Sequence, residues 1–320
     1  MPTPEAPTTD PADERTRLAW ARWQLTMPDA WEPLKMKGTV DKGHMIVGDA
    51  TCAVFSVDWE RATGKAVSDG DAWVVERLKK HGLLASHPSA PARSRFTACG
   101  WAHNLQTQED KHTTYWYGYS APANLLLGVK VNGVLPEDIR DVVIDQVLPT
   151  LDTFADDSAS TWAMYGLSFE VPAGFELHQK HLFSGDVALE FRRGRKETLM
   201  LRQVYPGNLA LKRRSFKRWI KTYPFKEHRR LPKRRMTFEP FEPDDRPELT
   251  GQCRRGRKRL PFPLGWVAAR HSCAIAAHDT QRHRLLVAEH LSRHKPDESV
   301  VRDAIFQMNL AQPGGGRDDR

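Results

Sequence analysis

Residues 162–177, WAMYGLSFEVPAGFEL, decide the predicted fold because a similar stretch precedes them at residues 20–34, WARWQLTMPDAWEPL. In both stretches a Trp is followed three residues later by another aromatic residue, and an extended apolar run then ends at a proline, Pro28 or Pro172. A further aromatic residue stands three positions after each proline and is followed by Glu. Two copies of one strand-and-turn pattern predict a duplicated domain.

The order of the elements that follow also repeats. Alternating apolar residues predict a strand over residues 53–59 of the first copy, and Pro136 followed by acidic residues predicts a closing helix to about residue 147. The second copy closes with a helix from Pro296, and helices are also expected over residues 68–82 and 215–223. This order predicts an α+β fold of two tandem domains, each an antiparallel sheet flanked by helices.

The length of 320 residues fits two domains of ordinary size. The polar, acid-rich start and the glycine-rich end are typical of disordered tails, and the small polar residues between the copies are typical of a linker. The expected boundaries are a tail at residues 1–14, an acidic first domain at 15–152, a linker at 153–161, a basic second domain at 162–312 and a tail at 313–320.

The opening of the second copy resembles the PsbP-like family in two places, Tyr165-Gly166 before the apolar run and residues 172–175, PAGF, after it. That family includes the photosystem II extrinsic protein, a Ran-GTPase-binding family and bacterial chaperone-like proteins of secretion effectors. The first copy departs from the pattern, with Trp23-Gln24 and Asp29-Ala30 at the matching positions. The resemblance implies two PsbP-like domains and a non-catalytic binding function, and it carries over no functional residue.

Charge is distributed unevenly along the chain. Residues 1–160 contain 16 basic and 22 acidic residues, whereas residues 161–320 contain 32 basic and 18 acidic ones, within a net charge of +8. Such asymmetry bears on partners rather than on the fold. It favours an acidic partner for the second domain, and it leaves open self-association between the acidic first and the basic second domain.

The cations of the second half are concentrated in two runs. Residues 212–235 contain 12 Lys and Arg against one acid, Glu227, and a shorter run follows at 254–259. Phe216 and Trp219 lie among these cations, either as stacking platforms for nucleic-acid bases or, at their helical spacing, as core residues. The residues predicted to contact a partner are Lys212, Arg213, Arg214, Lys217, Arg218, Lys221, Arg229, Arg230, Lys233, Arg234, Arg235, Arg254, Arg255, Arg257, Lys258 and Arg259.

These features predict a non-enzymatic binding or scaffold protein that engages an acidic macromolecule through its basic second domain. The partner is either an acidic protein surface or nucleic acid, because charge alone supplies affinity for both. A third alternative is an enzyme whose pocket is built from residues distant in sequence. No GxSxG, P-loop, GxGxxG or HExxH motif occurs, and we assign no catalytic residue.

The cysteines and histidines give one weak prediction. Four Cys without CxxC spacing are typical of buried, reduced thiols. His271 and Cys273 would share one face of a strand, and a hairpin turning near residues 279–280 would bring His283 opposite them as a third zinc ligand. The ligand spacing is not a standard one, so we expect exposed or hydrogen-bonded histidines, no metal and no cofactor.

The first residues show neither a basic n-region nor an apolar h-region, and no run approaches the length of a membrane span. Because the cysteines are also expected to be reduced, the sequence predicts a cytoplasmic protein without a membrane segment.

Overall fold

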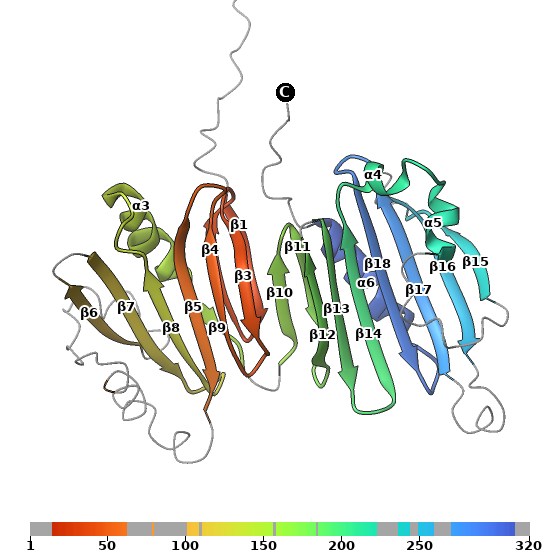
Figure 1. Ribbon diagram of the computed structural model, residues 1–320. Coiled ribbons are helices and arrows are strands. Elements are labelled where there is room, and N and C mark those ends of the chain that lie inside the picture. The colour runs from red at the N-terminus through yellow and green to blue at the C-terminus, as the bar shows by residue number, and fades with distance from the viewer. Residues whose placement is uncertain are drawn as a thin grey trace, which may run out of the picture. The chain divides into compact units, whose positions relative to one another are not determined.

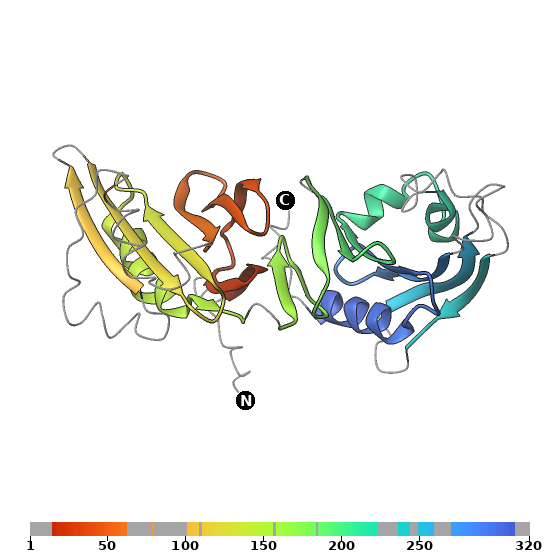
Figure 2. The same cartoon turned by 90° about the horizontal axis from the view of Figure 1, so that it is seen from below.

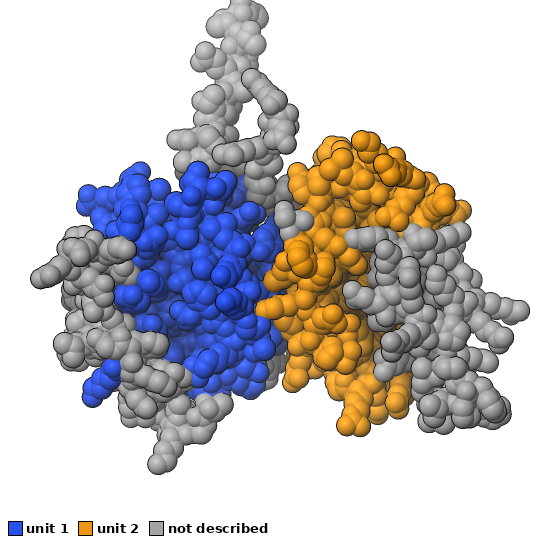
Figure 3. Space-filling model, in the orientation of Figure 1, with its two compact units in different colours: residues 1–166, 313–320 blue, residues 167–312 orange. Residues whose placement is uncertain are grey.

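The structure, a computed structural model, describes residues 15–62, 79, 101–108, 111–155, 158–183, 185–222, 236–243, 249–258 and 270–310. The chain divides into two compact units, residues 1–166 with 313–320 and residues 167–312 (Figure 3). The two predicted tails and almost all of the predicted helix at 68–82 lie outside the described residues.

The first unit contains a six-stranded antiparallel sheet (Figure 1). Apolar side chains alternate along its central strands, and Met45, Val57 and Val129 are completely or almost completely buried. In spatial order the strands are β3 (Glu32–Gly38), β4 (Lys42–Gly48), β5 (Ala53–Arg61), β8 (Leu125–Val131), β7 (Lys111–Ser120) and β6 (Trp101–Gln108).

A five-stranded sheet is built from both copies of the opening motif. Its order is β11 (Leu167–Val171), β10 (Ser160–Met164), β1 (Arg15–Ala21), β2 (Trp23–Pro28) and β9 (Asp152–Thr153). A two-residue turn joins β1 to β2, with Trp20 opposite Trp23 and Ala21 at a φ of 56°. β1 also pairs antiparallel with β10, which places Trp20 directly opposite Trp162. The predicted linker at 153–161 therefore includes the last residue of β9 and the first residues of β10.

Four tryptophans form the core between these two sheets. Trp20, Trp23 and Trp162 project from the five-stranded sheet and Trp59 from β5, and none is more than 2% exposed. The ring centroids of Trp20 and Trp162 are 4.6 Å apart in an edge-to-face arrangement, and Trp59 lies 6.2 Å from Trp20 and 5.9 Å from Trp23. Edge-to-face contacts of this kind add to the stabilisation from burial of the rings.

The second unit contains a seven-stranded antiparallel sheet. Its first six strands follow the order of the six-stranded sheet: three consecutive strands lie side by side, and the later ones return from the centre to the edge. In spatial order they are β12 (Glu176–Phe183), β13 (Asp186–Arg193), β14 (Glu197–Val204), β18 (Arg284–Ser292), β17 (Arg270–Asp279), β16 (Leu249–Lys258) and β15 (Met236–Phe241).

Most of the described helices are short, and α6, with 13 residues, is the exception. They are α3 (Glu137–Asp141), the π-helical turn η4 (Val142–Val147), the 3-10 turn η5 (Leu148–Thr150), α4 (Gly207–Leu211), α5 (Phe216–Thr222) and α6 (Glu298–Leu310). α6 lies on one face of the seven-stranded sheet and α4 and α5 lie on the other (Figure 2). The predicted helices after Pro136, over 215–223 and after Pro296 all correspond to described elements.

The predicted α+β class, with two sheets each flanked by helices, is wrong. The described residues form three antiparallel sheets and are mostly β. In the first unit the described helical residues are one continuous run, residues 137–150, formed by α3, η4 and η5. In the first unit the tryptophan core is instead closed by a second sheet, which begins with the hairpin of residues 15–28.

One buried histidine holds the start of α6. The backbone N–H of Asp297 donates to Nδ1 of His290 at 3.1 Å, and Asp297 Oδ1 accepts from the Ser299 N–H at 3.0 Å. Burial lowers the pKa of His290, with partial opposition from its backbone contact at Asp297.

Acidification should therefore destabilise the second unit. In the unfolded chain the His290 ring is protonated with the ordinary histidine pKa of 6.5. In the folded protein the same ring is protonated only at lower pH. The stability that neutral His290 contributes to the folded state is thus fully present above pH 6.5 and is lost as the pH falls below this value. We expect the melting temperature to be lower at about pH 5.5 than at about pH 7.5.

The matched variant is His290→Asn, whose amide oxygen can still accept from the Asp297 N–H without titrating in this range. Its melting temperature should fall less steeply over the same two pH values. Equal slopes for the two proteins would show that His290 does not contribute.

Candidate functional site

The candidate site is formed by α4 and α5, which follow β14 at one end of the seven-stranded sheet (Figure 1). α4 is docked at its first residue, because the Gly207 N–H donates to the carbonyl oxygen of His283. A side chain at Gly207 would meet that oxygen at 2.8 Å, so only glycine permits this approach. Ser215 precedes α5, and its carbonyl accepts from the Trp219 N–H at 2.9 Å.

The aromatic residues of α5 face the sheet. Trp219 is completely buried, and Phe216 stacks against it with ring centroids 6.1 Å apart. Both pack on Met200, Val287 and neighbouring apolar residues of β14, β17 and β18. Of the two alternatives for these aromatics, the core position is therefore the one found. Because α5 is amphipathic, its cations Lys217 and Arg218 lie on the exposed side.

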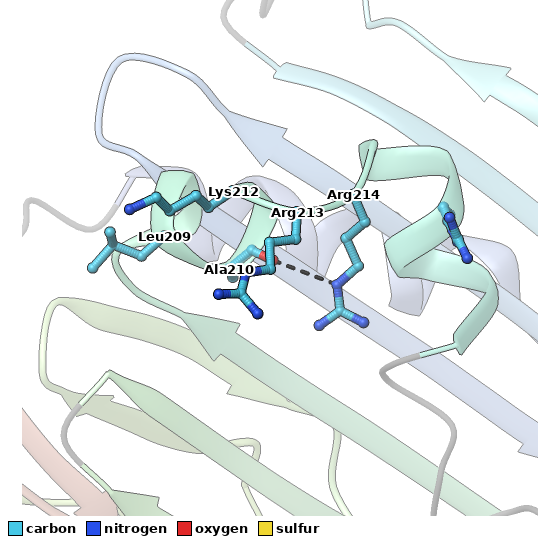
Figure 4. Close-up of a pocket in the computed structure, with 6 residues that line it drawn as sticks. Leu209, Ala210, Lys212, Arg213 and Arg214 are labelled. Carbon is cyan, nitrogen blue, oxygen red and sulfur yellow. Dashed lines mark hydrogen bonds between the residues drawn. The ribbon is translucent and has the colours of Figure 1, made fainter.

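A basic pocket of about 640 Å³ lies over the connection from α4 to α5 (Figure 4). The guanidinium groups of Arg213 and Arg214 point to the same side of this connection, and Arg214 Nε donates to the Ala210 carbonyl at 3.5 Å. The lining residues are Leu209, Ala210, Lys212, Arg213, Arg214 and Arg218. Four of these six side chains are cationic and none is acidic.

Several of these cations are uncompensated. In the part of the chain that the structure describes, Lys212, Arg213 and Lys217 are exposed and form no ion pair. Lys and Arg side chains gathered in this way produce a positive potential that attracts anions. We call Lys212, Arg213, Arg214, Lys217 and Arg218 the basic patch.

Apolar side chains next to the patch were not identified from the sequence. Leu209 lines the pocket and is 64% exposed, and Tyr205, just before α4, is 45% exposed. A single leucine gives no signal of exposure by itself. The short helix α4 turns Leu209 away from the sheet, and this orientation depends on the docking of Gly207.

Other predicted contact residues are only partly placed. The backbone of Lys221 belongs to α5, and those of Arg254, Arg257 and Lys258 belong to β16. Six more lie outside the described residues, namely Arg229, Arg230, Lys233, Arg234, Arg235 and Arg259.

Arg255 is not part of the basic patch. Side chains alternate between the two faces of a strand, so Cys273 of β17 lies on the face opposite to Ala276, which packs under α5. Arg255 is paired with Cys273 across β16 and β17 and shares that opposite face. There it forms ion pairs with Glu239 and, at 2.9 Å, with Glu298 of α6. Arg255, which belongs to the basic run at 254–259, therefore does not extend the surface formed by the cations of the first run.

The predicted zinc ligands do not meet. Cys273 is paired with His290 across β17 and β18, whereas His283 lies in the turn at the far end of this hairpin. The turn does follow Asp279, as predicted, but it takes up the residues to His283, which therefore never pairs with β17. No group of three potential ligands occurs among the described residues.

Comparison with known proteins adds no relative. The sequence matches no protein family model, and no curated protein is similar to it. The resemblance to the PsbP-like family therefore stays a prediction. Among the described helices, none combines the length and the apolar character that a membrane span requires.

Proposed function

We propose that this chain is a non-enzymatic binding protein whose second unit engages an acidic protein partner through the basic patch. The observation that supports this most is the pocket of about 640 Å³ lined by four cations and no acid. The same proposal includes a cytoplasmic location, because the cysteine pattern is typical of reduced thiols.

Two physical effects would operate at the patch. The positive potential steers an acidic partner toward it and raises the association rate, more strongly at low salt. Once the partner is bound, the guanidinium groups of Arg213 and Arg218 can donate charge-assisted hydrogen bonds to carboxylates, which are about twice as strong as neutral ones.

The neighbouring apolar side chains favour a protein over a nucleic acid. Leu209 and Tyr205 offer exposed apolar area beside the cations, as interfaces with peptides and proteins do. The stacking platforms that a nucleic-acid site needs are not supplied by Phe216 and Trp219, because these rings belong to the core. Nucleic acid stays the alternative partner, since phosphates would also be attracted to the patch.

Charge reversal tests the proposal. The triple variant Lys212→Glu, Arg213→Glu and Lys217→Glu should bind fluorescent poly-glutamate, as the acidic probe, at least about 10-fold more weakly than the wild type. These three side chains are exposed and make no ion pair among the described residues, so the melting temperature should stay the same. Fluorescence anisotropy at low and moderate salt measures the affinity.

A matched control changes the net charge by the same amount elsewhere. Lys35, Lys37 and Lys196 are exposed lysines outside the patch, and their triple replacement by Glu should weaken binding much less. Comparable loss in both triple variants would show that overall charge, not the patch, binds the probe.

A retention experiment then separates the two partner classes. The full-length protein is incubated with native lysate with and without nuclease, beside the patch variant. Protein retained by the wild type after nuclease, and lost in the variant, supports the proposal. Retention that disappears with nuclease, together with a steep linear fall of log affinity with log salt for an oligonucleotide, would replace it by the nucleic-acid alternative.

A further inference from the structure

Two cysteines face each other on the side of the seven-stranded sheet that α6 covers. Cys253 of β16 is paired with Ile275, and Cys273 of β17 is paired with Arg255, so the cysteines are diagonal neighbours across two adjacent strands. Both are free thiols, 6% and 2% exposed. Their side chains form a hydrogen bond with each other.

The surroundings of the two thiols differ. The hydrogen bond from Cys273 holds the pKa of Cys253 below its usual range, and the nearby Arg255 acts in the same direction, against the effect of burial. The same hydrogen bond, with burial, raises the pKa of Cys273. Two carboxylates, Glu239 and Glu298, are also close, but both are paired with Arg255. Cys253 is therefore the thiol that ionises first, and a thiolate is the reactive form of cysteine.

A pocket gives small molecules access to Cys273, the diagonal neighbour of Cys253. Its volume is about 770 Å³, and it reaches the Cys273 side chain. Arg255, Lys295 and the residues at the start of α6 form most of the remaining wall. A hydroperoxide is small and polar enough to enter such a pocket.

We propose that Cys253 and Cys273 form a reversible disulfide when the folded protein meets a hydroperoxide. The inference is independent of the basic patch, which lies on the other face of the sheet. The two cysteines are thus a site of redox modification beneath the N-terminal end of α6.

The reaction balances in two steps. The Cys253 thiolate attacks one oxygen of the hydroperoxide and becomes a sulfenic acid, and the other oxygen leaves as an alcohol, or as water from hydrogen peroxide, after taking a proton. The sulfur of Cys273, on losing its proton, then attacks the sulfenic sulfur and displaces water. Two thiols are oxidised by two electrons, and the peroxide is reduced.

The other cysteines do not share this arrangement. Cys52 lies between β4 and β5, where its N–H donates to Asp49 Oδ1 at 2.9 Å, and it is not in contact with another described cysteine. Cys99 lies outside the described residues. Replacing both by serine leaves Cys253 and Cys273 as the two remaining thiols and removes competing cross-links.

The test uses the full-length Cys52→Ser/Cys99→Ser protein under native conditions. Hydrogen peroxide should abolish both alkylatable thiols, and peptide mapping should show one cross-linked peptide pair that joins Cys253 to Cys273. Dithiothreitol should restore both thiols, while tryptophan fluorescence shows that the fold is kept throughout. If both thiols survive peroxide, end as sulfinic or sulfonic acids, or cross-link only after denaturation, the proposal is overturned.

Single replacements test the order of the steps. Cys273→Ser should leave a sulfenic acid on Cys253 that dimedone traps, because no resolving thiol is present. In Cys253→Ser, the Cys273 thiol should stay reduced and unlabelled. The opposite pattern would contradict the assignment of Cys253 as the attacking thiol. The cross-link in the parent protein depends on neither variant, so it decides the proposal even if one of them folds poorly.

Discussion

Replacing Asp279 by alanine should destabilise the second unit by about 3–5 kcal/mol, because it leaves a buried guanidinium without its counter-charge. Asp279 and Arg284 are 0% and 1% exposed, and Arg284 Nη2 lies 3.2 Å from Asp279 Oδ2. Asp279 Oδ1 also accepts from the Arg282 N–H at 2.9 Å, which fixes the turn between β17 and β18. Burial lowers the pKa of Arg284, and the charge of Asp279 opposes this shift.

The expected result is a fall of roughly 10 °C in the unfolding transition of this unit, measured by calorimetry. An exposed pair of the same chemistry provides the control. Asp41 and Arg61 are 3.5 Å apart with side chains 59% and 39% exposed, and Asp41→Ala should cost less than about 1 kcal/mol.

A double variant tests the reason for the loss. When Arg284→Met is added to Asp279→Ala, the uncompensated charge disappears, and part of the lost stability should return. If the double variant is no more stable than Asp279→Ala alone, the cost comes from the turn and not from the buried charge.

The second large effect is expected for Trp162→Ala in the first unit. Trp162 is 2% exposed and packs edge to face on Trp20. Removing a buried indole of this kind should cost about 3–5 kcal/mol, through lost burial and the cavity that remains. Replacement of Phe183, an aromatic residue that is 65% exposed, should change stability by no more than about 0.5 kcal/mol.

Hydrogen exchange of backbone amides locates the part of the structure that Trp162→Ala destabilises. Backbone amides of β1, β2 and β5 should lose protection in Trp162→Ala, because their strands surround the tryptophan core, while β13, β14 and β18 should keep theirs. Loss of protection mainly in β13, β14 and β18 would mean that Trp162 belongs with the second unit. That result would agree with the domain boundary predicted from the sequence, which starts the second domain at residue 162.

The repeated motif was visible in the sequence, but its alignment was not. Matching Trp20 to Trp162 is the obvious choice by residue type. In the structure the turn after β1 lies between Trp20 and Trp23, and the turn after β10 lies between Met164 and Leu167. Aligned by these turns, Trp162 corresponds to Leu18. The two positions differ by one period of a strand and share a face, so either can carry the large aromatic residue.

The error in fold class has a similar local cause. The hairpin of residues 15–28 turns at Ala21 and Arg22, and Ala21 adopts a positive φ of 56°. Turns of this kind normally contain Gly, Asn or Asp, so the sequence carries no turn signal there. The pattern therefore predicts only the strand that ends at Pro28, and neither β1 nor the sheet that it forms with β2 is expected.

At the candidate site, local patterns were predicted and long-range placement was not. The cations at 212–218 and the inward face of α5 follow from composition and helical spacing. The separation of Arg255 from them depends on the register of β16 against β17 and on which face α5 covers. Both are tertiary properties, and one sequence contains no record of them. The exposed Leu209 was missed for the same reason.

The pairing of β1 with β10 also constrains the order of events during synthesis. β1 leaves the ribosome about 140 residues before β10, its neighbour on one side, with Trp20 opposite Trp162. Until residues 160–164 emerge, the nascent chain carries an open strand edge and an incompletely covered indole, features that promote wrong association between chains. The sheet that contains β1 therefore cannot form completely before residues 160–164, near the end of the first unit, have been made.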